Sequence, residues 1–154
     1  MRKKAIIILS VICALIVAFI WGNSILSPEI SDKIGRAAGS ILSGFLGQGD
    51  ETVTVGGLSV RKVGHFCEFF ALGIAAWLFW RFLAVDKAWR IVLTSLVGIA
   101  IPFFDETIQI FSGRGHSIKD VWIDIGGFSA GVLVTVFAIW VVSAIVKRVK
   151  TNNK

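Results

Sequence analysis

The chain has 154 residues, of which 55% are hydrophobic and 17% are charged, and its mean hydropathy is +0.80. These values lie outside the range of soluble domains and indicate an integral membrane protein. The net charge of +6 would suggest nucleic-acid binding in a soluble protein, but in a membrane protein it is the expected signature of orientation and of contact with anionic lipids, so a nucleic-acid partner is excluded.

Four apolar stretches are each long enough to cross about 30 Å of hydrocarbon as a helix. They are residues 5–21, 63–83, 89–111 and 121–146. The first is interpreted as a retained helix and not as a signal peptide, because no small-x-small cleavage site follows it and Trp21 stands where an interfacial anchor is expected. The sequence therefore predicts an all-α fold, a bundle of four transmembrane helices forming a single membrane domain over residues 1–154.

The connection over residues 22–62 contains a predicted amphipathic helix. Ser27, Pro28 and Glu29 form a helix start, with an N-cap, a proline at the first position and an acid in the first turn. Apolar residues then recur at helical spacing, namely Ile30, Ile34, Ala37, Ile41 and Phe45. This pattern suits a helix in the outer membrane interface and equally a helix packed over the mouth of the bundle. Residues 47–57 are predicted to form a flexible loop or a short hairpin.

Lys and Arg are concentrated on one side of the predicted bundle. The side with both termini carries ten of them against Asp86 alone: Arg2, Lys3, Lys4, Arg81, Lys87, Arg90, Lys147, Arg148, Lys150 and Lys154. The other side carries six Lys and Arg against nine acids. Because a positive excess marks the cytoplasmic side, we expect both termini to face the cytoplasm.

Polar residues from the second, third and fourth predicted helices fall at one depth. At 1.5 Å per residue, all of them lie within roughly 10 Å of the outer boundary. They are His65, Glu68, Asp105, Glu106, Gln109, Asp120 and Asp124. Within each helix, residues three or four apart share a face. Below Asp124, the same face continues to Gly127 and Gly131, a small-xxx-small ridge that allows a neighbouring helix to approach closely.

Taken singly, such acids are often only hydrated helix ends, and Asp120 suits a helix N-cap. As a set they favour a hydrated, outward-facing pocket, because ionisable groups at membrane depth usually pair or line a cavity. Arg114, in the turn between the third and fourth helices, is close enough in sequence to reach back over the carboxylates. His116 is interpreted as a solvated turn residue.

The segments "RKVGHFCEFFALG" and "DETIQIFSGRGHSIKDVWIDIGGFSAG" together resemble the VanZ-like family of small bacterial membrane proteins. The resemblance covers residues 61–131, and the first helix fits in layout only. It assigns the family's His-x-x-Glu to His65 and Glu68, and its Asp-Glu-x-x-Gln to Asp105, Glu106 and Gln109. The turn arginine falls on Arg114, and the last-helix pattern falls on Asp120, Asp124, Gly127 and Gly131.

Two positions depart from the family pattern. Phe69 stands where the family often has Tyr, and Ser112 stands where it often has Pro; with no Tyr in the chain, a phenolic proton donor is excluded. The resemblance implies a multi-pass protein of the bacterial plasma membrane that acts at the outer face in the cell envelope. It also implies a role in resistance to glycopeptide antibiotics of the teicoplanin type, after the family's namesake.

Three hypotheses are left open for the pocket. As an enzyme site, His65 titrates near neutrality with Glu68 or Asp105 as its acid/base partner, while Arg114 holds a phosphate or carboxylate of a lipid-linked envelope substrate. As a divalent-metal site, a metal-dependent hydrolase included, it offers one nitrogen and several oxygen ligands: His65, Glu68, Asp105, Glu106 and Asp124. As a non-catalytic module, it fixes helix register and binds a lipid headgroup or a glycopeptide. The oligomeric state is left open.

Overall fold

The computed structural model describes residues 2–26, 29–30, 33–34, 36–37, 40, 54–55, 58–113 and 118–152. Its long elements are four helices: α1 (Arg2–Ile25), α3 (Val60–Phe82), α4 (Lys87–Phe111) and α5 (Ile118–Asn152). All four are long and apolar enough to cross a membrane. The prediction of an all-α protein with four transmembrane helices is therefore confirmed. The last helix continues six residues beyond its predicted end at residue 146, because Lys and Arg are good helix formers once the chain leaves the membrane.

The connection between α1 and α3 is described only in part. Strands β1 (Thr54–Val55) and β2 (Leu58–Ser59) pair antiparallel as a short hairpin, of which only β1 lies within the loop or hairpin predicted for residues 47–57. Within the predicted amphipathic helix, the described residues are helical, and Ile30 and Ile34 are 47% and 53% exposed. The rest of that predicted helix lies outside the described residues.

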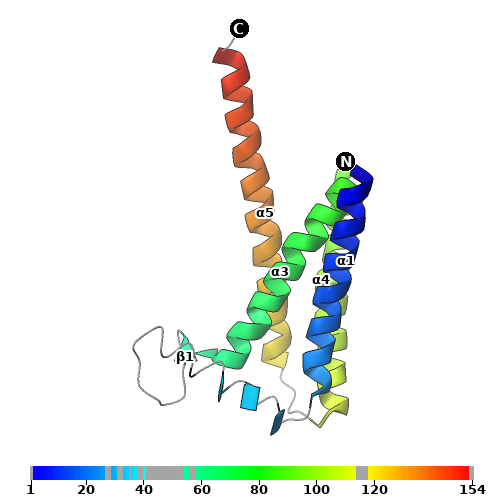
Figure 1. Ribbon diagram of the computed structural model, residues 1–154, viewed down its shortest axis with the longest axis vertical. Coiled ribbons are helices and arrows are strands. Elements are labelled where there is room, and N and C mark those ends of the chain that lie inside the picture. Colours follow the sequence, from blue (N-terminus) through cyan, green and yellow to red (C-terminus); the bar gives the residue numbers. More distant parts are fainter. Residues whose placement is uncertain are drawn as a thin grey trace.

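The four long helices alternate in direction (Figure 1). At one end of the bundle, α1 and α4 end while α3 and α5 begin; we call this the polar end. Both chain termini lie at the opposite end, and the last turns of α5 extend beyond the other helices (Figure 1). Every polar residue singled out in the second, third and fourth predicted helices belongs to a turn at or near the polar end.

A small apolar core lies below the polar end. Its buried members come from three helices: Ile20 of α1, Phe69, Leu72 and Ala76 of α3, and Phe128 of α5. Phe69, at the position where the family often has Tyr, is fully buried in this core. Its ring therefore contributes to packing through apolar burial.

Glycines allow α3 and α5 to approach closely. A Cβ atom built on Gly127 would lie 2.4 Å from the carbonyl oxygen of Phe66, and one on Gly131 would lie 2.1 Å from that of Phe70. On α3, a Cβ atom built on Gly73 would likewise lie 2.2 Å from the carbonyl oxygen of Phe128 of α5. No side chain fits at these positions without separating the two backbones. The contact fixes the distance between the helices that carry His65 and Asp124.

Candidate functional site

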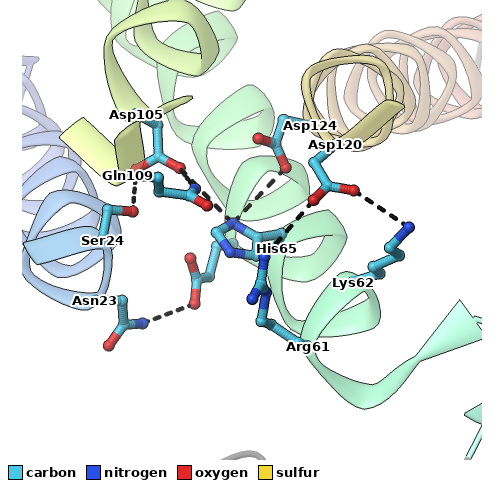
Figure 2. A network of polar contacts seen from close by, with 10 residues as sticks. Asn23, Ser24, Arg61, Lys62, His65, Asp105, Gln109, Asp120 and Asp124 are labelled. Carbon is cyan, nitrogen blue, oxygen red and sulfur yellow. Dashed lines mark hydrogen bonds and ion pairs between the residues drawn. The ribbon is translucent and has the colours of Figure 1, made fainter. Parts of the chain in front are cut away.

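The polar end holds a group of side chains that point toward one another from four helices (Figure 2). We call this group the polar cluster. It contains Asn23 and Ser24 of α1, Arg61, Lys62, His65 and Glu68 of α3, Asp105, Glu106 and Gln109 of α4, and Asp120 and Asp124 of α5. The carboxyl groups of Asp105 and Asp124 are 0% and 1% exposed. Such burial at membrane depth is costly for charged groups unless other groups compensate the charge.

His65 lies between two carboxylates (Figure 2). Its Nδ1 is 3.9 Å from Oδ2 of Asp105 and 3.8 Å from Oδ1 of Asp124. Its side chain is 12% exposed, whereas those of the two carboxylates are almost fully buried. Both separations exceed hydrogen-bonding distance. The three side chains therefore surround a common point and do not form a directly bonded triad.

Two neighbours hold Asp105 in place. The hydroxyl of Ser24 donates to Oδ1 at 2.5 Å, and the Nε2 amide of Gln109 donates to Oδ2 at 2.7 Å. Ser24 and Gln109 are themselves buried. Each of these donors is directed at one carboxylate oxygen, so the two bonds together fix the orientation of the Asp105 carboxyl group.

The rim of the cluster carries further polar contacts. Nδ2 of Asn23 donates to Oε1 of Glu68 at 3.0 Å. Asp120 forms ion pairs with both cations at the start of α3, with its Oδ1 3.3 Å from Nζ of Lys62 and its Oδ2 3.7 Å from a guanidinium nitrogen of Arg61. These two pairs connect the first turn of α5 to the first turn of α3.

The sequence-based prediction missed the α1 contribution and the role of the two rim cations. Asn23 and Ser24 follow the predicted first span directly and lie at the same level as the other polar groups, which was the available signal. Arg61 and Lys62 were counted only as topology charges, although they stand one turn before His65 and share its end of α3.

The structure brings most of the predicted site residues together. Glu106 is buried, with 7% of its surface exposed, and acts electrostatically on Asp124. Arg114 and His116 lie outside the described residues. Gly127 and Gly131 take no part in the polar cluster itself and lie at the α3–α5 contact below it.

The geometry of His65, Asp105 and Asp124 suits a divalent metal ion. Their ligand atoms, one from each residue, lie within 4.8 Å of one another. Metal–nitrogen and metal–oxygen bonds of about 2.1 Å allow two ligands of one ion to be up to about 4.2 Å apart. Both distances from His65 Nδ1 meet this limit, and the two carboxylate oxygens lie within 4.8 Å of each other. One imidazole with two carboxylates fits zinc, manganese or iron.

The electrostatic surroundings also favour a cation. Asp124 experiences the negative charges of Asp105, Asp120, Glu106 and Glu68. A divalent ion among His65, Asp105 and Asp124 would compensate part of this negative charge, which is costly at membrane level when it is uncompensated. The hydrogen bonds from Ser24 and Gln109 would keep Asp105 in place as a ligand of such an ion.

The Ser24–Asp105 hydrogen bond yields a first prediction. Ser24→Ala should lower metal affinity by about tenfold to a hundredfold, because partners that orient a ligand typically contribute this much. Titration of the apo protein with Zn²⁺ or Mn²⁺ measures the effect. Ser10→Ala is the matched control, because Ser10 is an exposed serine of the same helix whose hydroxyl donates to the carbonyl of Ile6. Equal affinities for Ser24→Ala and Ser10→Ala would contradict the assignment of Asp105 as a ligand.

Comparison with known protein families identifies the family of the chain. A family model described as VanZ/LLP1 matches residues 6–140 and thereby includes every member of the polar cluster. No curated protein and no solved structure matches the chain. The match extends the resemblance found in residues 61–131 to most of α1, which supplies Asn23 and Ser24. The chain is thus a multi-pass membrane protein that belongs to the VanZ/LLP1 family.

Proposed function

We propose that this protein is a metal-dependent membrane hydrolase that acts on the phosphoryl group of a lipid-linked envelope substrate. One observation carries the proposal: three helices direct an imidazole nitrogen and two buried carboxylates to within 4.8 Å of one another. Buried ionisable groups gathered at membrane level are a functional site by default.

Each residue of the cluster has a definite role in this proposal. His65, Asp105 and Asp124 would hold the ion, while Ser24 and Gln109 keep Asp105 oriented by their hydrogen bonds. A bound divalent ion supplies Lewis acidity toward a phosphoryl oxygen and lowers the pKa of a water ligand. Glu68, which accepts a hydrogen bond from Asn23, is suited to take a proton from the attacking water. Arg61 and Lys62, already at the rim beside Asp120, are suited to hold the remaining phosphoryl oxygens.

The polar end is proposed to face the outside of the plasma membrane. The support is the charge distribution, since the opposite end carries both termini and ten Lys and Arg against one acid. A hydrolase with this orientation meets the head groups of the outer leaflet. Its substrates are therefore the lipid-linked intermediates of the cell envelope, and a change in glycopeptide susceptibility would follow from altered envelope chemistry.

The experiment is a hydrolysis assay on purified protein in detergent. A polyprenyl diphosphate is offered as substrate, with Zn²⁺ or Mn²⁺ added, and release of inorganic phosphate is measured. We expect turnover that disappears when a chelator removes the ion and returns when the ion is restored. Absence of phosphate release from folded, metal-loaded protein would reject this substrate class for the site.

The dense hydrogen bonding around Asp105 favours a second candidate, a non-catalytic module that binds a lipid headgroup or a glycopeptide. Buried polar networks of this kind can serve to fix helix register and ligand geometry without chemistry. This candidate predicts saturable binding of teicoplanin or of anionic lipid vesicles by protein that releases no product. Asp124→Asn would then weaken binding, whereas hydrolysis would be undetectable in the original protein.

A further inference from the structure

An apolar groove of about 480 Å³ lies between α1, α3 and α4, immediately below the polar cluster. It is defined here by Ala14, Ala18, Trp21, Leu72, Ala76 and Ile101, and its remaining lining is likewise apolar or aromatic apart from Cys13. The volume falls within the range of about 300 to 1,000 Å³ that is usual for pockets that bind small molecules.

The groove and the polar cluster share the same faces of three helices. Leu72 stands four residues after Glu68 on α3, Ile101 four residues before Asp105 on α4, and Trp21 three residues before Ser24 on α1. Residues three or four apart lie on one helix face. At 1.5 Å per residue, the groove therefore begins about 6 Å below the polar groups. The polar cluster and the groove therefore follow one another along the same helix faces.

The shape of the groove suits an extended hydrocarbon chain. Leu72 and Ala76 form a buried floor, whereas Ala14 and Ala18 are exposed and leave the α1 edge open toward the membrane. On α3 the lining continues from Leu72 to Trp80, a rise of about 12 Å. Alanines spaced four apart on α1 keep this side shallow, because larger side chains there would fill the space.

We propose that the groove binds the hydrocarbon chain of the lipid whose head group occupies the polar cluster. The proposal rests on the proposed function only for the location of the head group. The chain enters from the surrounding leaflet past Ala14 and Ala18 and lies against Leu72 and Ala76. Its contacts hold the head group at the depth of His65, Asp105 and Asp124.

Photochemical labelling tests the groove directly. The probe is a long-chain alkyl phosphate with a diazirine midway along its chain, added to the purified protein and irradiated. We expect labels on the α1 segment 13–21 and the α3 segment 72–80. Ala18→Trp should remove most of this labelling at limiting probe, because the indole side chain would occupy the space in which the chain of the probe packs. Ala14→Phe fills the same edge and provides a second variant if the first does not fold.

Leu15→Trp is the matched control, because Leu15 is 63% exposed on the same helix and does not line the groove. Labelling that is unchanged in folded Ala18→Trp or Ala14→Phe, or that falls outside the groove, would overturn the proposal. If the groove is labelled but the protein does not hydrolyse the substrate, the proposed function is rejected and the groove proposal stands. Conversely, hydrolysis that is equally fast in the groove-filling variants and the original protein rejects the groove and leaves the hydrolase intact.

Discussion

Asp124→Asn and His65→Ala should each lower the rate of hydrolysis by at least about a hundredfold. Removing a residue that only orients a metal ligand typically lowers activity about tenfold to a hundredfold, and removing a ligand itself should lower it further. Asp124 is almost fully buried beside His65, with Oδ1 at 3.8 Å from Nδ1. The amide of Asn keeps the size of the side chain but removes its charge, so metal content should fall together with activity. Phosphate release and elemental analysis of the same preparations measure both quantities.

Asp86→Asn provides the control for these variants. Asp86 is an exposed carboxylate in the connection between α3 and α4, at the end of the bundle opposite the polar cluster, and its side chain makes no capping hydrogen bond. This substitution should leave both metal content and turnover unchanged. If Asp124→Asn retains activity in a folded protein, the carboxylate is neither a metal ligand nor a participant in the chemistry.

The second large effect is expected on the stability of the contact between α3 and α5. Gly131→Ala should destabilise the bundle by about 3 kcal/mol, at the upper end of the usual cost of overpacking, because the new methyl group meets backbone and not a movable side chain. Its Cβ would lie 2.1 Å from the carbonyl oxygen of Phe70, so α3 and α5 must separate. His65 and Asp124 would separate with them. Thermal unfolding in detergent measures the first effect, and metal affinity measures the second.

Gly126→Ala separates this contact from the general effect of a methyl group on a helix. Gly126 belongs to the same helix, yet nothing lies within 4 Å of a Cβ built there. Alanine has the higher helix propensity, so this variant should be as stable as the original protein or slightly more stable. Equal destabilisation by both substitutions would mean that the close approach of α3 and α5 is not what the glycines provide.

Much of the fold follows from patterns that are local in sequence. Apolar runs of membrane-spanning length predict the helices, and the alternation of direction follows because each of these helices crosses the membrane once. The depth of the polar groups then follows from helix rise alone. The sequence predicted the last membrane span, residues 121–146, but not the further helical residues up to Asn152, because hydropathy marks the membrane span and not the end of the helix.

The geometry of the site depends on features that no local pattern contains. Which carboxylate faces His65 is decided by the rotation of α4 and α5 about their axes, and this rotation is set by packing such as that of Gly131 on Phe70. The contribution of Ser24 required knowing that α1 lies beside α4 at the polar end. Likewise, Arg61 and Lys62 were recognisable as charges in the sequence, but their pairing with Asp120 is a tertiary contact.

The most direct test of the account is the metal content of the folded protein, purified in detergent and compared before and after treatment with a chelator. We expect one tightly bound divalent ion per chain. The chelator should remove both this ion and the hydrolytic activity, and adding the ion back should restore the activity. Folded protein that hydrolyses lipid-linked phosphate at full rate without a stoichiometric metal ion would contradict the assignment of His65, Asp105 and Asp124 as its ligands.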